Sequence, residues 1–151
     1  MDLKKSCTGH NSRDAILVAS RVLIALLFVI FGWGKLMNFQ GTVQYMTQVG
    51  APIPTVATIV AIVMEFFVGL AIVLGVFTRP LALLLALYTL GTALIGHHYW
   101  TMTGMAQFEN EINFYKNISI IGGLLALWVA GPGQYSVDAR LRGSGCRPPA
   151  A

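Results

Sequence analysis

The sequence has 151 residues, of which 56% are hydrophobic and only 11% are charged. Soluble domains contain roughly 45–50% apolar and about 25% charged residues, so this composition argues against a water-soluble globular protein. The formal net charge is +4, from 10 Lys and Arg against 6 Asp and Glu. This excess contains no basic run typical of a nucleic-acid-binding surface, so nucleic acid is not an expected partner.

The apolar residues fall in four blocks, each close to the ~20 residues that a helix needs to cross a bilayer. Membrane barrel strands would alternate apolar and polar residues, which the run from Leu81 to Leu87 does not do. We therefore predict an all-α, polytopic membrane protein, a bundle of four transmembrane helices at residues 15–141. The predicted spans cover residues 15–36, 55–77, 81–100 and 115–130.

Residues 1–14 are expected to form an N-terminal tail and residues 142–151 a flexible C-terminal tail. The first span follows a basic stretch, as a signal peptide does, but Arg21 interrupts it and no good cleavage site follows, so we expect it to remain as an anchor. The turn at residues 78–80 is short, which predicts that the second and third helices are antiparallel neighbours.

Basic residues indicate the orientation of the bundle, because they are enriched in cytoplasmic loops. They concentrate before the first span, in the short turn and after the last span, at Lys4, Lys5, Arg13, Arg79, Arg140, Arg142 and Arg147. Both termini are therefore predicted to lie in the cytoplasm.

Glu65 lies near the middle of the second span. An ionised carboxylate there costs about 3 kcal/mol or more, so its side chain should face the bundle and have a partner. Three interpretations stay open: a structural ion pair with Arg21, which lies inside the first span, a carboxylate that handles protons or ligands, and a neutral, hydrogen-bonded carboxyl group.

Polar residues gather on the predicted outer side, where they would form one polar vestibule. They are Lys35, His97, His98, Glu109, Glu111, Lys116 and Asn117. Adjacent histidines on a helix point about 100° apart, so His97 and His98 are poorly placed to bind one metal ion together. Three roles remain open for these histidines. One histidine could bind a metal ion together with Glu109 or Glu111, both could simply form hydrogen bonds at the headgroup level, or they could transfer protons or contact a quinone.

Lys116 opens the fourth span, where it would either neutralise Glu109 or Glu111 or extend to the membrane surface. Cys7 and Cys146 lie in hydrophilic tails on the predicted cytoplasmic side, so a structural disulfide is not expected. The sequence has no motif for haem attachment, dinucleotide binding or phosphate binding, and we predict no metal site.

Small residues recur four apart in the apolar blocks, a spacing that lets helix backbones approach closely. This pattern favours contacts within the bundle, with a homo-oligomer interface as the alternative. The pairs and triplet are Ala57 and Ala61, Ala71 and Gly75, Ala82 and Ala86, and Gly122, Ala126 and Ala130.

Residues 15–141 resemble the DoxX family of small four-span membrane proteins, which is related to the DoxD subunit of thiosulfate:quinone oxidoreductase. The motifs that carry the resemblance are, in order, Arg21, Gly32-Trp33-Gly34-Lys35-Leu36, Glu65 with Gly69, Gly75-Val76-Phe77-Thr78-Arg79, Lys116-Asn117, and Gly131-Pro132-Gly133-Gln134-Tyr135-Ser136-Val137-Asp138. Each motif is weak alone, but their order and spacing together are specific.

The resemblance implies a subunit of an oxidoreductase in a bacterial-type inner membrane. Electrons would pass from sulfur compounds or thiols to quinone, or the subunit would take part in oxidative-stress defence. Protein partners in a redox complex would then accompany the bilayer itself. A quinone would need proton donors and a nearby charge, for which the candidates are Glu65, His97 and His98 as catalytic residues and Arg21, Lys35, Lys116 and Asn117 as binding residues. A non-enzymatic scaffold and a small-solute carrier are the alternatives.

Overall fold

The computed structural model describes residues 3–141 and residue 143, with side chains from Ser12 onward. Every regular element among these residues is helical, as predicted. The elements are α1 (Leu3–Met37), α2 (Phe39–Gln48), α3 (Pro54–Ile62), the π-helix η1 (Val63–Val68), α4 (Gly69–Leu74), α5 (Thr78–Gly96), the 3-10 turn η2 (Tyr99–Thr101), α6 (Gly104–Ala130) and α7 (Val137–Leu141). Cys146, the side chain of Cys7 and most of the expected C-terminal tail lie outside the described residues.

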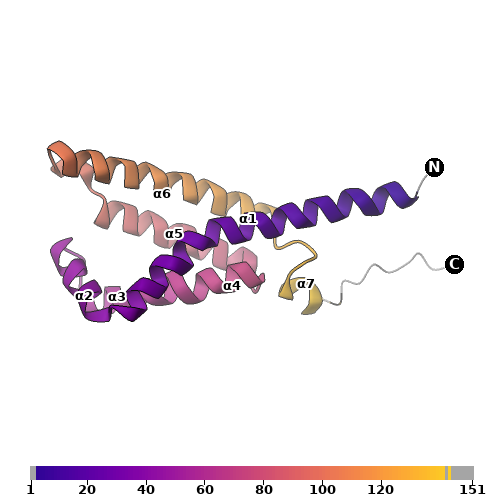
Figure 1. The fold of residues 1–151 in the computed structure, drawn as a ribbon, viewed down its shortest axis with the longest axis horizontal. Coiled ribbons are helices and arrows are strands. Elements are labelled where there is room, and N and C mark those ends of the chain that lie inside the picture. Colours follow the sequence, from indigo (N-terminus) through magenta and orange to yellow (C-terminus); the bar gives the residue numbers. More distant parts are fainter. Residues whose placement is uncertain (1–2, 142, 144–151) are drawn as a thin grey trace.

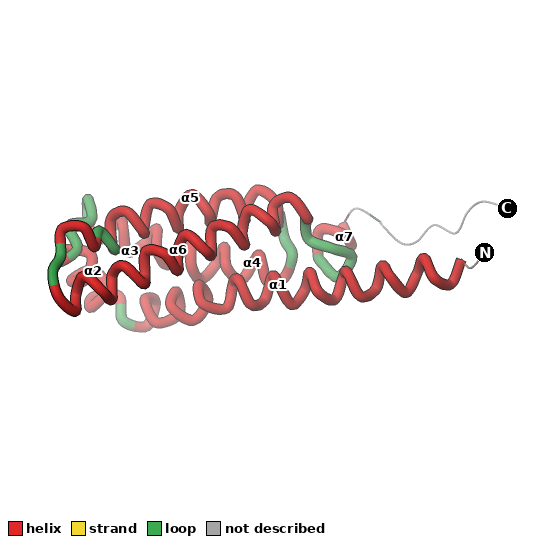
Figure 2. Tube along the Cα trace, turned by 90° about the horizontal axis from the view of Figure 1, so that it is seen from above, coloured by secondary structure: helices red, strands yellow, loops and turns green. Residues whose placement is uncertain are grey.

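Four helical segments are long and apolar enough to cross a membrane, and they confirm the prediction of a four-helix membrane bundle. They cover Ser12–Met37, Pro54–Leu74, Thr78–Thr101 and Gly104–Ala130. The segments run up and down along one long axis, and the start of α1 lies at the same end as α7 (Figures 1 and 2). Many large apolar side chains, such as Leu23 and Val129, are exposed on the outside of the bundle, where lipid would cover them.

Two connections differ from the sequence-based expectation. The first contains α2, whose N-terminus is capped by Asn38: its side chain accepts a hydrogen bond from the Gly41 N–H at 3.2 Å. The second is short, because α6 begins at Gly104, well before the expected start of the fourth span. Phe114, in this early part of α6, packs its ring edge-on against Tyr99 with centroids 5.6 Å apart. Ring contacts at the bundle end thus hold a helix where polar residues alone predicted a loop.

The turn between α4 and α5 is held by Asp138, at the beginning of α7. Gly75 has a φ of 75°, which suits glycine, and ends α4. The Asp138 carboxylate then accepts hydrogen bonds from the backbone N–H groups of Phe77 at 2.8 Å and Thr78 at 3.0 Å, the first donors of α5. The chain reverses within these few residues, so α4 and α5 are antiparallel neighbours, as predicted.

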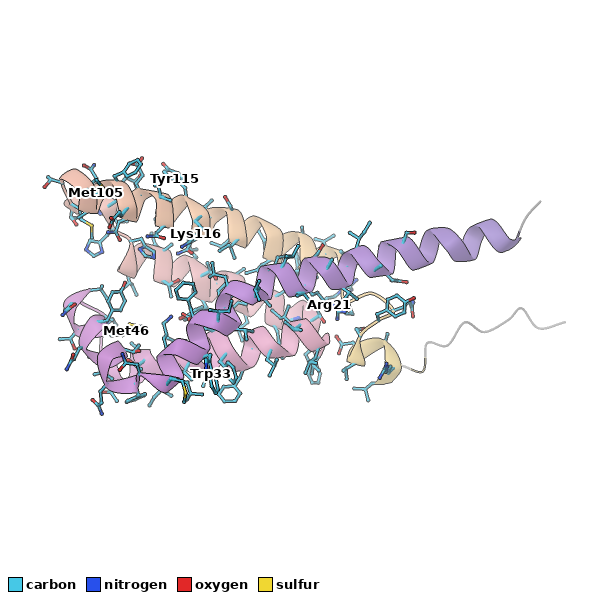
Figure 3. The ribbon with its side chains drawn as sticks, in the orientation of Figure 1. Arg21, Trp33, Met46, Met105, Tyr115 and Lys116 are labelled. Carbon is cyan, nitrogen blue, oxygen red and sulfur yellow. The ribbon has the colours of Figure 1, made fainter. Side chains whose placement is uncertain are left out.

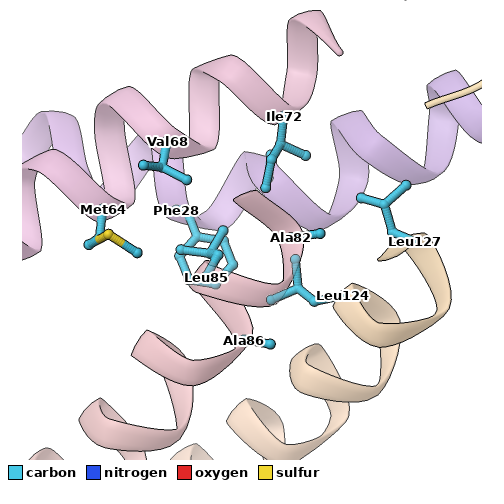
Figure 4. Close-up of a cluster of buried hydrophobic side chains, with 10 residues drawn as sticks. Phe28, Met64, Val68, Ile72, Ala82, Leu85, Ala86, Leu124 and Leu127 are labelled. Atoms are coloured by element: carbon cyan, nitrogen blue, oxygen red, sulfur yellow. The ribbon is translucent and has the colours of Figure 1, made fainter. Parts of the chain in front are cut away.

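The apolar core occupies the half of the bundle nearer α7. It is formed by side chains from all four spans: Ala25, Phe28, Met64, Val68, Ile72, Ala82, Leu85, Ala86, Leu124 and Leu127 (Figure 4). The core residues of the third and fourth spans lie toward the α7 end, whereas Ala25 and Phe28 lie near the middle of the first span. Phe28 also lines the cavity of the candidate site, which occupies the half nearer α2.

Candidate functional site

Glu65 lies in the π-helical turn of the second span, with only 8% of its surface exposed. π-Helical turns inside α-helices occur frequently at functional sites. α1 approaches this turn closely at Gly32, where an added Cβ would lie 2.5 Å from the backbone nitrogen of Phe66. Glycine at position 32 is therefore required for α1 to reach the backbone beside Glu65.

The partners of Glu65 are Lys35 and Tyr88. The Lys35 ammonium donates to Oε2 at 2.5 Å, and the Tyr88 hydroxyl donates to Oε1 at 2.8 Å. Of the three interpretations of Glu65, the ion pair with Arg21 is therefore wrong. Arg21 and Lys35 are about 21 Å apart along α1 at 1.5 Å per residue, so one carboxylate can reach only one of them. The close contact at Gly32 places Glu65 beside Lys35.

Arg21 lies instead toward the α7 end of the bundle (Figure 3). Its side chain is 1% exposed, and Nη2 donates to the backbone carbonyl of Tyr135 at 2.5 Å. Its Nη1 lies against Gly75, where any Cβ would overlap it. Arg21 thus fastens the segment before α7 to α1, and it is not among the residues that line the cavity described next.

A cavity of about 950 Å³ opens in the α2 half of the bundle, between α1, α2 and α3 on one side and α5 and α6 on the other. Most of its wall is apolar. Its polar lining residues are Lys35, Asn38, Thr42, Tyr45, Glu65, Tyr88, Thr89, Thr92, His97, Asn113, Lys116 and Asn117. Glu65, Lys35, His97, Lys116 and Asn117, five of the seven candidate residues, therefore share one cavity.

The two histidines have different surroundings. His97 lines the cavity, and its Nδ1 lies 3.0 Å from the side-chain oxygen of Asn110. His98 does not line it, and its Nδ1 donates to the carbonyl of Ile95 at 2.8 Å. In the described part of the chain, no three His, Cys, Asp or Glu side chains are grouped so that they could hold a metal ion.

Lys116 and Asn117 are on α6, on the cavity wall opposite α1. Lys116 lies at a similar position along the long axis to Trp33, two residues before Lys35 (Figure 3). Its ammonium donates to the Asn113 side chain at 2.7 Å rather than to Glu109 or Glu111. Asn117 is 8% exposed, and it makes no hydrogen bond through its side chain to any residue that the structure describes.

Tyr88 is a partner of Glu65 that was not among the candidate residues of the sequence analysis. It lies within the third span, and its hydroxyl is the second partner of Glu65. A phenol inside an apolar span needs a hydrogen-bond partner, and this requirement was the signal available in the sequence. Together, Lys35, Glu65 and Tyr88 place an ion pair and a hydroxyl at the wall of an otherwise apolar space. Such a site can donate hydrogen bonds to a lipid-soluble ligand and move a proton.

The chain was compared with known proteins. The family model described as DoxX matches residues 16–98. Inner membrane protein YphA of Escherichia coli K12 is 55% identical over 129 residues, which cover 85% of this chain and 92% of YphA. Inner membrane protein YqjF of the same organism is 40% identical over 131 residues, 85% of this chain and 93% of YqjF.

A more distant similarity is found in eukaryotes. The ER-derived vesicles protein ERV29 of Saccharomyces cerevisiae is 30% identical over 132 residues, which cover 87% of this chain but only 36% of ERV29. No solved structure matches.

Proposed function

Because the chain belongs to the DoxX family of membrane proteins, we propose that it is an inner-membrane subunit of a redox assembly and that its cavity binds a quinone. The observation that carries this proposal is the single cavity shared by Glu65, Lys35, Tyr88 and His97. A partner protein would supply the electrons, from thiols or other sulfur compounds. Both termini would lie in the cytoplasm and the cavity on the outer side of the membrane.

The residues of the cavity fit a quinone. A quinone is a flat apolar ring with carbonyl oxygens that accept hydrogen bonds. The apolar wall suits the ring, and the donors are the ammonium groups of Lys35 and Lys116 and the amide of Asn117. The side chain of Asn117, which makes no hydrogen bond to a described residue and lines the cavity, is free to donate to a ligand on that wall.

A bound quinone supplies an acceptor of two electrons and two protons. The protein residues would orient the ring and hold charge and protons beside it. Lys35 would donate to one carbonyl oxygen while Glu65 keeps the ammonium in place. Tyr88 would fix the other oxygen of Glu65, so that the carboxylate does not rotate away from Lys35. His97, whose imidazole can both accept and donate a proton, would connect the cavity to the membrane surface.

The test is purification in a mild detergent, followed by mass spectrometry of extracted quinones and co-purifying proteins. We would compare the wild type with Glu65→Gln and with Glu109→Gln, which removes a carboxylate outside the cavity. The expected result is a quinone retained by the wild type and Glu109→Gln and lost from Glu65→Gln. Gel filtration would establish that each variant is folded, and Tyr88→Phe gives a milder change at the same carboxylate.

Two results would contradict the proposal. A quinone retained equally by all variants would place its binding outside this cavity. A protein partner that co-purifies with every variant, with no quinone in any of them, would favour the scaffold instead.

A further inference from the structure

Hydrogen-bond donors outnumber free acceptors among the charged groups of the cavity wall. Both oxygens of Glu65 already accept a hydrogen bond, from Lys35 and from Tyr88. Each lysine ammonium has three protons. One proton of Lys35 is used by Glu65, and one proton of Lys116 by the side chain of Asn113. Each ammonium therefore keeps protons for an acceptor that enters the cavity.

The formal charge of the wall is also uneven. Lys35 and Glu65 neutralise each other across 2.5 Å. Lys116 has a neutral amide as its partner, and within the described residues it forms no ion pair with a carboxylate. A positive charge thus remains on the α6 wall, at a cavity whose lining is mainly apolar. Lys116 is an exposed residue, so its ammonium can be reached from outside the bundle as well as from the cavity.

Asn117 adds a second donor beside this charge. It directly follows Lys116 on α6, and both residues line the cavity. The residue is 8% exposed, and its side chain makes no hydrogen bond to a described residue. Its amide N–H groups are therefore available to an acceptor that enters the cavity.

We infer that the ligand of this cavity carries a negative charge, and that Lys116 and Asn117 bind its charged group. The inference rests on the proposed function, and it narrows the ligand class. A quinone whose ring carries an ionised hydroxyl group should bind more tightly than a neutral quinone of the same size. The negative oxygen would accept from Lys116 and Asn117, while apolar residues such as Val60 and Ile95 contact the ring.

The experiment compares two rings of nearly equal size by isothermal titration calorimetry, on the full chain in lipid-free, non-ionic detergent. 2-Hydroxy-1,4-naphthoquinone is ionised at neutral pH, and 2-methyl-1,4-naphthoquinone is neutral. We expect the wild type to bind the hydroxyl compound about tenfold more tightly, as for a hydrogen-bonded charge in a partly apolar site. Lys116→Gln should remove this preference and Lys116→Arg should keep it. Arg140→Gln, a change on α7 outside the cavity, is the matched control.

Asn117→Asp tests the inference at the second proposed binding residue while Lys116 is unchanged. It places a carboxylate beside the ligand, so it should weaken binding of the hydroxyl compound more than that of the methyl compound. Equal affinity of the wild type for the two quinones would overturn the inference, and so would a preference that survives Lys116→Gln.

One further ligand separates this inference from the proposed function. 2-Naphthoate is an anionic ring without quinone chemistry. If 2-naphthoate binds with the same dependence on Lys116 while neither quinone binds, the inference stands and the quinone function fails. If both quinones bind equally, the function stands and the inference fails. Competition by added phosphatidylglycerol that depends on Lys116 would support the inference, with a lipid headgroup as the source of the anion.

Discussion

Glu65 is an acidic residue that the bundle satisfies completely. Its carboxylate accepts from an ammonium group and from a phenol, and both donors come from other spans. Removing one partner of a buried pair leaves an uncompensated charge, which costs more than the pair itself contributes. The ion pair is therefore better evidence for the position of Lys35 at the cavity than for stability.

A double-mutant cycle tests this view of the pair. Lys35→Met should destabilise the bundle by about 3 kcal/mol, because it leaves Glu65 charged and without its cation. The double variant Lys35→Met, Glu65→Gln should be clearly more stable than the sum of the two single changes predicts. Unfolding by a denaturing detergent, followed by circular dichroism, measures each corner of the cycle. Additive effects would mean that the two side chains do not interact in the membrane.

Tyr88→Phe removes the other hydrogen bond to Glu65 while it keeps the ring. The expected loss of stability is about 1 kcal/mol, the usual net value of one hydrogen bond. The variant should also bind quinone less tightly, because the carboxylate is then held at one oxygen only. Thr92→Val, a change of a second cavity hydroxyl that bonds to the backbone of its own helix, is the control.

At the scale of elements, close approach of helices determines where the functional residues meet. Gly32 lets α1 touch the π-helical turn. Gly69 lies against Val29, because a Cβ added at Gly69 would be only 3.2 Å from the Val29 side chain. Gly32 on α1 and Gly69 on α4 both lie where α1 packs against the second span, at η1 and α4. Small residues allow this proximity in a membrane, where no hydrophobic driving force brings helices together.

Two glycines of α1 provide a matched comparison. In Gly32→Ala, the new methyl group meets the backbone of Phe66, and we expect a loss of about 1–3 kcal/mol and weaker ligand binding. In Gly34→Ala, nothing lies within 4 Å of the new methyl group, so the helix should be unchanged or more stable by up to about 1 kcal/mol. Thermal unfolding in detergent measures both. Equal effects of the two changes would contradict the close contact at Gly32.

Asp138 connects α7 to the start of α5. Asp138→Ala removes an acceptor from two backbone N–H groups, and the expected cost is about 2 kcal/mol. Asp138→Asn keeps one acceptor oxygen and should cost less. Both variants should retain ligand affinity once folded, because Asp138 lies at the end of the bundle away from the cavity. A change in ligand affinity without loss of stability would show that the two ends are coupled.

The two halves of the bundle differ in structure: one half is mainly packed core, and the other half holds the cavity. Toward α7 lie the apolar core, Arg21 and the turn held by Asp138, and toward α2 lies the cavity. Among the described residues, the α7 end also contains the lysines and arginines Lys4, Lys5, Arg13, Arg79 and Arg140, whereas those of the cavity are only Lys35 and Lys116. The positive-inside rule therefore predicts that the α7 end faces the cytoplasm.

Reporter fusions and cysteine labelling test this orientation. Green fluorescent protein fused after the last residue should fluoresce, and alkaline phosphatase at the same place should be inactive. Gln107, which is exposed near the start of α6, is the opposite probe. Gln107→Cys, in a background where Cys7 and Cys146 are serine, should react with an impermeant maleimide in intact spheroplasts. The reverse pattern would place the cavity on the cytoplasmic side.

The amino-acid sequence by itself determined the class of the protein. Long apolar blocks with few charges predict helices in a membrane, because an unpaired backbone cannot lie in lipid. The prolines and glycines between these blocks indicated where the helices turn. The same reasoning missed α2 and the early start of α6, because both segments contain polar residues and are held by local caps and ring contacts.

The sequence also identified the charged residues of the cavity wall, because a charge is costly in or beside an apolar span. Only the tertiary structure decided how they pair. Arg21 and Lys35 are both basic residues of the same helix, and hydropathy does not distinguish them as partners of Glu65. The choice depends on where Gly32 lets α1 touch the π-helical turn, and such a contact between distant segments is a property of the folded bundle.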